Sequence, residues 1–127
     1  MFESKPRVLV IDDDAQVLRA FSRLLSRHFL VESEAAAAPA LRRLAGGESF
    51  DVILCDRNLP GGMSGQDFFE AVDPAVQKRI VICSGAPLAP DDAFAAVLGS
   101  RFFLKSSDAA GLAALLLRVA RRKASAA

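Results

Sequence analysis

At its centre the chain reads Val52-Ile53-Leu54-Cys55-Asp56, followed by Arg57-Asn58-Leu59-Pro60-Gly61-Gly62. Four apolar residues that end on a carboxylate are typical of a strand buried on both faces of a parallel sheet. The proline and the two glycines then predict a turn. We therefore expect Asp56 at the carboxyl end of a central strand, which is where open parallel α/β sheets bind their ligands.

The same alternation of an apolar strand and a helical segment runs along the whole chain. Strands are predicted over 7–11, 30–34, 52–56, 79–83 and 101–104, and helices over 15–29, 35–45, 65–72, 93–98 and 108–123. Such alternation favours an α/β fold, a doubly wound five-stranded parallel sheet with helices on both faces. The strand at 30–34 is short and carries glutamates, so we expect it at an edge. Residues 1–127 are expected to form a single domain with a core from about 5 to 122.

Composition excludes several classes of function. Apolar residues make up 52% of the 127 residues, and the formal net charge is +1. A charge so close to zero gives no electrostatic reason to bind nucleic acid or an anionic membrane. No apolar run approaches the ~20 residues that span a bilayer, and the N-terminus does not resemble a signal peptide. We expect a cytoplasmic protein.

The two cysteines, Cys55 and Cys83, both lie in apolar strand segments. In a cytoplasmic chain such thiols are usually reduced core residues rather than a disulfide or a metal site. Because each directly precedes a polar residue at the end of neighbouring predicted strands, we expect the two sulfur atoms to lie close together and to point away from Asp56.

Four predicted strands end in polar residues, namely Asp12-Asp13, Asp56, Ser84 and Lys105. Each alone could be a helix cap, a turn residue or a solvated side chain, but parallel strands bring all four ends to one edge. Three clustered carboxylates require a cation, and hard oxygen ligands suit Mg²⁺ or Mn²⁺. A lysine and a hydroxyl supply donors for phosphoryl oxygens. With no histidine or cysteine expected at this edge, the residues predict phosphoryl transfer onto a carboxylate.

Four motifs resemble those of the receiver domains of two-component response regulators, and the resemblance covers residues 5 to about 122. The motifs are Val8-Leu9-Val10-Ile11-Asp12-Asp13-Asp14, Asp51-Val52-Ile53-Leu54-Cys55-Asp56-Arg57-Asn58-Leu59-Pro60, Ile80-Val81-Ile82-Cys83-Ser84-Gly85 and Phe102-Phe103-Leu104-Lys105. The resemblance implies a flavodoxin-like sheet with the strand order 2-1-3-4-5 and a signalling domain that is not an enzyme.

The resemblance also assigns the metal site and the acceptor. Asp56 corresponds to the phosphoacceptor, and Asp12 and Asp13 to the acidic pair that holds Mg²⁺. Asp13 is expected to bind the metal directly and Asp12 partly through water. The backbone carbonyl of Asn58 would be a further ligand.

The resemblance assigns a switch as well. Ser84 takes the place of the switch hydroxyl, Lys105 that of the invariant lysine, and Phe102 that of the aromatic switch residue, here without a hydroxyl. The implied phosphoryl donor is a histidine kinase or a histidine phosphotransfer protein. The implied output is contact with a downstream protein through the face formed by 93–98, 101–104 and 108–123.

Three features depart from the family pattern. Ser106 stands where proline usually follows the lysine in a cis peptide, and because a non-proline cis bond costs roughly 3 kcal/mol, a trans peptide is expected. The loop 59–65 is one residue longer than usual and resembles loops of receivers found with hybrid sensor kinases. Arg57 and Ala86 occupy positions where the family tunes the lifetime of the phosphoryl group.

Two alternatives come from other classes. A phosphatase of the haloacid dehalogenase type also uses a strand-end aspartate, a Ser-Gly pair and a lysine, but it needs an acid two residues after the nucleophile, where this chain has Asn58. A degenerate receiver would act as a binding module without being phosphorylated, and Ser106 is the feature that favours it. Metal-dependent binding of beryllofluoride separates this alternative from a working receiver.

Overall fold

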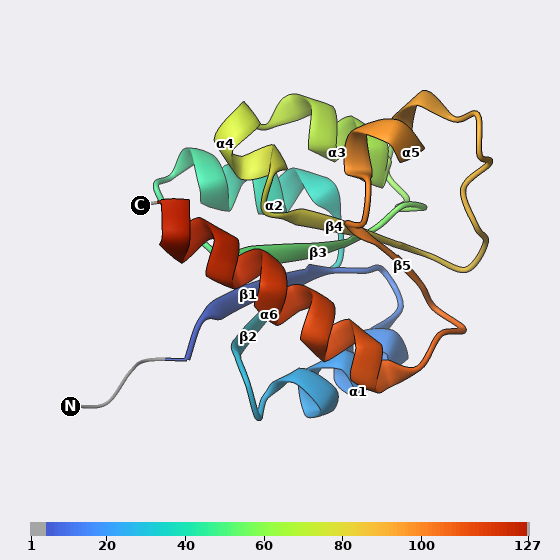
Figure 1. Ribbon diagram of the computed structural model, residues 1–127. Coiled ribbons are helices and arrows are strands. Elements are labelled where there is room, and N and C mark those ends of the chain that lie inside the picture. Colours follow the sequence, from blue (N-terminus) through green and yellow to red (C-terminus); the bar gives the residue numbers. More distant parts are fainter. Residues whose placement is uncertain (1–4, 127) are drawn as a thin grey trace.

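The computed structural model describes residues 5–126, which contain one parallel sheet and six helices (Figure 1). The strands are β1 (Arg7–Ile11), β2 (Leu30–Glu34), β3 (Val52–Asp56), β4 (Ile80–Ser84) and β5 (Phe102–Leu104). The helices are α1 (Ala15–Leu25), α2 (Ala37–Ala45), α3 (Gly65–Ala71), α4 (Pro74–Gln77), α5 (Ala93–Leu98) and α6 (Ala109–Ala126). Every predicted strand is present within one residue of its predicted bounds.

The sheet has the order β2-β1-β3-β4-β5, and all its strand pairs are parallel. This confirms the doubly wound fold. All residues of β3 and β4 are buried, as their continuous apolar runs predict. β2 lies at the edge and is partly exposed, which confirms the interpretation of its glutamates.

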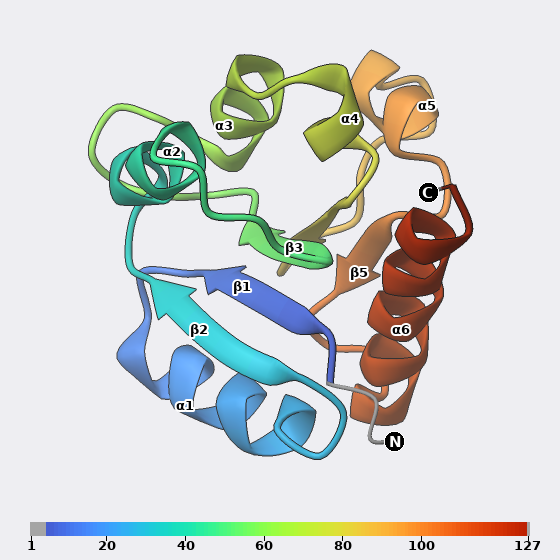
Figure 2. The same ribbon diagram turned by 90° about the vertical axis from the view of Figure 1, so that its left-hand side faces the viewer.

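The sheet separates two hydrophobic cores (Figure 2). Val8, Val10 and Leu54 face one core, which α1 and α6 cover. Leu9 and Ile11 face the other, which α2, α3 and α5 cover. Because neighbouring residues of one strand enter different cores, both faces must be apolar, and this is why the central strands read as unbroken apolar runs.

The first helix is shorter than the expected 15–29. Its start is confirmed: the Asp14 carboxylate accepts a hydrogen bond from the Gln16 amide at 2.8 Å, which satisfies a free donor of the first turn. Its end lies at Leu25, and the Phe29 amide still donates to the Leu25 carbonyl at 2.9 Å. The turn that follows the helix places the buried Phe29 ring in the core beneath α1.

Two other helix bounds differ from expectation. α2 begins two residues later than expected, and Ala36, which precedes it, is extended and makes no side-chain cap. The expected helix 65–72 ends at Ala71, and the short helix α4, which was not predicted, follows from Pro74. A proline ends one helix but suits the first position of the next. No helix within residues 5–126 is long and apolar enough to cross a membrane.

The expectation that the two sulfur atoms lie close together is wrong, although both cysteines are free and buried as predicted. The register aligns Cys55 with Ile82, and Cys83 with Asp56, one residue away from the assumed alignment. Cys55 belongs to the core beside α2, α3 and α5, whereas Cys83 belongs to the core beside α1 and α6. A shift of one residue moves a side chain to the other face, so the sulfurs lie on opposite faces and Cys83 stands beside Asp56.

Candidate functional site

The carboxyl ends of the strands meet at one edge of the sheet, on the right-hand side of Figure 1. Backbone hydrogen bonds fix this edge beyond the strands themselves. The Lys105 amide donates to the Ser84 carbonyl and the Arg57 amide to the Cys83 carbonyl, each at 2.8 Å. The residues that follow β3 and β5 are therefore held against the end of β4, which brings Asp56, Ser84 and Lys105 to the same edge, as the sequence predicts.

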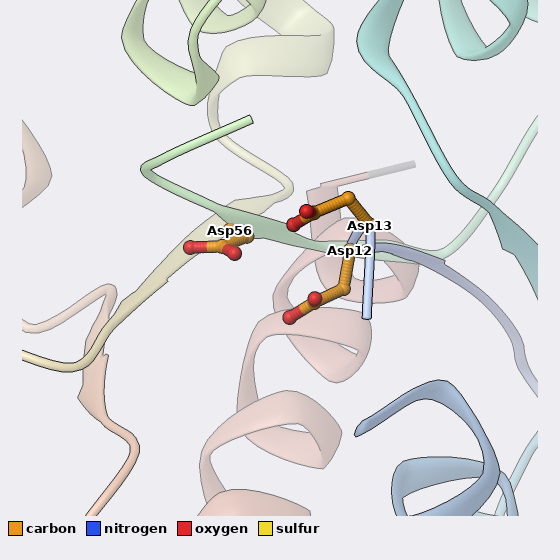
Figure 3. Close-up of side chains that lie close together, drawn as sticks. All are labelled: Asp12, Asp13 and Asp56. Atoms are coloured by element: carbon orange, nitrogen blue, oxygen red, sulfur yellow. The ribbon is translucent and has the colours of Figure 1, made fainter. Parts of the chain in front are cut away.

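Three carboxylates gather at this edge (Figure 3). Oxygen atoms of Asp12, Asp13 and Asp56 lie within 4.8 Å of one another. Asp12 is 2% exposed and Asp56 6% exposed, while Asp13 is open to solvent. The donor set is all oxygen, with one exposed side for water or a further ligand, and this fits a hard divalent cation such as Mg²⁺.

Backbone amides orient the two buried acids. The Asp14 amide donates to Oδ1 of Asp12 at 2.9 Å, and the Asn58 amide donates to Oδ1 of Asp56 at 3.1 Å. In each acid one oxygen is thus held by the loop that follows the strand. The second oxygen of each acid faces Lys105.

The Lys105 ammonium lies between the two buried acids, with Nζ 3.0 Å from Oδ2 of Asp12 and 3.2 Å from Oδ2 of Asp56. Burial alone would lower the pKa of Lys105, but the hydrogen bond and charge of Asp12, followed by those of Asp56, raise it above its usual value. The lysine therefore remains a cation at neutral pH and offsets the repulsion between the acids.

Burial raises the pKa of Asp56 above that of a free carboxyl. The Asn58 amide opposes this shift, the charge of Asp12 adds to it, and Lys105 again opposes it. The carboxylate form of Asp56, which is the nucleophilic form, thus depends on the donors and cations around it.

The two remaining switch candidates, Ser84 and Phe102, have partners other than the acids. Ser84 is 2% exposed, and its Oγ accepts a hydrogen bond from the Ala86 amide at 3.2 Å, so the hydroxyl is directed into its own loop. Phe102 is partly buried, is aligned with Ile82, and packs against the core beneath α5. No peptide bond within residues 5–126 is cis, so the Lys105–Ser106 bond is trans, as expected.

Sequence reasoning missed one residue that shapes the site. A Cβ atom added to Gly65 would lie 2.2 Å from the Asp56 carbonyl oxygen and 2.8 Å from the Arg57 Cα. The Gly65 amide also donates to the Arg57 carbonyl at 2.9 Å. The start of α3 therefore rests directly on the backbone of Asp56 and Arg57. The glycine was visible in the sequence, but only as the start of a helix.

A groove of about 530 Å³ lies elsewhere on the molecule. Its lining includes Leu41, Leu44, Val72 and Val76, and it reaches Arg79, which precedes β4. This places the groove at the amino ends of the strands, away from the acids. The groove is therefore separate from the acid cluster.

Comparison with known proteins agrees with this geometry. Residues 8–116 match the response regulator receiver domain family, while no curated protein matches the sequence. A CheY-like receiver domain protein from Methanospirillum hungatei JF-1 is 22% identical, with a TM-score of 0.81 over 98% of this chain and 100% of that one. A receiver domain protein from Clostridium thermocellum is 23% identical, with a TM-score of 0.81 over 96% and 99%.

A third structure, the chemotaxis protein CheY4 of Vibrio cholerae, is 26% identical, with a TM-score of 0.76 over 91% of this chain and 99% of that one. The family match spans most of the sequence and contains all five strands except Arg7, the first residue of β1. The chain belongs to the response regulator receiver domain family.

Proposed function

We propose that this domain receives a phosphoryl group on Asp56 and relays the signal by protein contact. The observation that carries the proposal is the acid cluster with Lys105, whose Nζ lies 3.2 Å from Oδ2 of Asp56. In the transfer, a carboxylate oxygen of Asp56 forms a bond to phosphorus while the bond from phosphorus to the donor's imidazole nitrogen breaks. The electron pair of the broken bond stays on the imidazole, which takes up a proton.

Asp12, Asp13, Asp56 and the backbone carbonyl of Asn58 would hold Mg²⁺ or Mn²⁺. When bound, the cation would neutralise the charge that builds up on the phosphoryl oxygens. The acids are suited to this role because their carboxylate oxygens lie close together and Asp13 is exposed to solvent.

Lys105 and Ser84 would recognise the attached phosphoryl group. The Lys105 ammonium already donates a hydrogen bond to Asp56, so a short movement lets it bind a phosphoryl oxygen. Ser84 must turn its hydroxyl from the Ala86 amide toward Asp56, and this movement displaces the loop that leads to α5. Phe102, which packs beneath α5, would follow into the vacated space.

The donor would be a histidine kinase or a histidine phosphotransfer protein. The output would be a protein that contacts the face formed by α5, β5 and α6. Val97 on α5 supports this choice, because its side chain is a large apolar group that is 57% exposed, and such groups suit protein contacts better than water. In this proposal residues 1–127 act as a single receiver domain.

The test is phosphorylation by acetyl phosphate with Mg²⁺, followed by intact mass measurement. The wild-type protein should gain one alkali-labile, hydroxylamine-sensitive phosphoryl group, and Asp56→Asn should gain none. Asp73→Asn is the matched control, because Asp73 lines the groove at the amino ends of the strands, away from the acid cluster. Equal labelling of Asp56→Asn and wild type would refute the assignment. Failure of the wild type to bind beryllofluoride with Mg²⁺ would favour a degenerate receiver.

A further inference from the structure

Arg57, the residue after Asp56, connects three elements of the site. Its amide donates to the Cys83 carbonyl on β4, and its carbonyl accepts from the Gly65 amide on α3. Its guanidinium reaches a third element, with Nη2 3.3 Å from Oδ2 of Asp92. The backbone of Arg57 is thus fixed, while its side chain binds the residue before α5.

Asp92 in turn controls the start of α5. Its Oδ1 accepts a hydrogen bond from the Phe94 amide at 2.8 Å, which caps the helix. The two carboxylate oxygens therefore have separate partners, the helix and the arginine. The loop 85–91 connects Ser84 to Asp92, so the ion pair holds the far end of the loop that carries Ser84.

We infer that the Arg57–Asp92 pair is a latch that holds the β4–α5 loop in its unphosphorylated position. This inference rests on the proposed function, because the loop moves only if Ser84 turns toward a phosphoryl group on Asp56. The backbone of Arg57 cannot follow that movement, since β4 and α3 hold it. A loop displacement that carries Asp92 away from this fixed backbone lengthens or breaks the ion pair, and the pair then sets part of the free energy that phosphorylation has to overcome.

The latch makes a prediction that ordinary electrostatics does not. Beryllofluoride is an anion that mimics the phosphoryl group, so long-range charge effects alone would make Arg57→Gln bind it more weakly and Asp92→Asn more tightly. If the pair is a latch, both variants bind it more tightly. The pair is partly exposed, with side-chain exposures of 30% and 26%, and pairs of this kind support a change of roughly two- to fivefold.

The variants and their control keep the cap of α5 and match the change in net charge. Asparagine is a good helix cap, so Asp92→Asn removes the charge but keeps an acceptor for the Phe94 amide. Asp91→Asn is the matched control, because Asp91 is the exposed neighbour and its replacement changes the net charge equally. The double variant should bind beryllofluoride no more tightly than the tighter single variant. Either substitution alone already breaks the Arg57–Asp92 ion pair, so the second has no further interaction to remove.

Two measurements decide the inference. Titration with beryllofluoride and Mg²⁺, followed by amide chemical shifts, should give lower dissociation constants for Arg57→Gln and Asp92→Asn than for wild type and Asp91→Asn. Without these ligands, hydrogen exchange of the α5 amides should be faster in the same two variants only. Opposite shifts in affinity, or single-variant effects that add in the double variant, would overturn the latch.

The outcomes separate this inference from the proposed function. A wild-type protein that binds no beryllofluoride refutes the function and, with it, the coupling to phosphorylation. A wild-type protein that binds it, with variants of unchanged affinity, leaves the function standing and refutes the latch. Unchanged hydrogen exchange in Arg57→Gln shows, whatever the affinities, that the pair does not hold α5.

Discussion

Replacing Gly65 with alanine should destabilise the domain by about 1–3 kcal/mol, although alanine is the better helix former. The new Cβ would lie 2.2 Å from the Asp56 carbonyl oxygen, and a separation of 3.0 Å is about the least that real Cβ atoms show. The helix α3 or the end of β3 must therefore move by about 0.8 Å, the difference between these two distances. The atoms in the way belong to the backbone and cannot rotate aside.

Three contributions determine the magnitude. Overpacking of this kind costs about 1–3 kcal/mol. The hydrogen bond from the Gly65 amide to the Arg57 carbonyl is worth about 1 kcal/mol. The gain in helix propensity from glycine to alanine is at most about 1 kcal/mol, because Gly65 is the first residue of α3 rather than an interior one. This gain at most offsets the hydrogen bond if the displaced backbone breaks it, and the overpacking remains.

Urea unfolding of Gly65→Ala and wild type measures this difference, and Gly111→Ala is the control. Gly111 lies in the first turn of α6 with nothing within 4 Å of its added Cβ, so this variant should be unchanged or up to about 1 kcal/mol more stable. Gly65→Ala should also bind beryllofluoride and Mg²⁺ more weakly, because the displaced backbone carries Asp56. A variant as stable as Gly111→Ala with unchanged ligand affinity would refute the reasoning.

Three further predictions concern charge and the switch. Asp13→Ala should abolish Mg²⁺-dependent shifts of amides around the acid cluster without reducing stability, because removing one exposed acid relieves repulsion; retained shifts would contradict the metal site. Hydrogen bonds from Arg7 and then Arg43 lower the pKa of Glu32. That stabilisation is present above the unfolded pKa of about 4.3 and is lost as pH falls through the lowered folded value. Urea unfolding should therefore show Glu32→Gln less stable at pH 7 by under about 1 kcal/mol, and this difference should shrink as the pH falls below the unfolded pKa. A difference in unfolding free energy that does not shrink on acidification would contradict the role of the Glu32 charge. Ser84→Ala should still be phosphorylated on Asp56, but amide shifts of α5 and Phe102 on adding beryllofluoride should be lost, and equal shifts in both proteins would exclude the switch.

The elements that the sequence predicts well are those in which local pattern and burial agree. β3 is an unbroken apolar run bounded by turn residues, and its observed bounds equal the predicted ones. The convergence of Asp56, Ser84 and Lys105 was also predictable, because the carboxyl ends of parallel strands share an edge. These positions follow from the order of elements alone and need no knowledge of exact register.

Features that depend on register or on long-range pairing were not predictable. The alignment of Cys83 with Asp56, rather than with Cys55, is set by how β3 and β4 slide past each other, and both alignments fit the same apolar pattern. The Arg57–Asp92 pair joins residues 35 positions apart, and no local signal connects them. α4 was missed because Pro74, which ended the predicted helix, also begins the next one.

The two edges of the sheet have a consequence for self-association. β2 is an outer strand that carries Glu32 and Glu34, and both carboxylates bind Arg43 of α2. β5, at the other edge, has only three residues. Charged and very short edge strands resist the addition of a strand from another molecule. Pairing of copies through extended backbone, the usual route to β-aggregates, is therefore disfavoured on both sides, and the helical faces are the surfaces left for recognition.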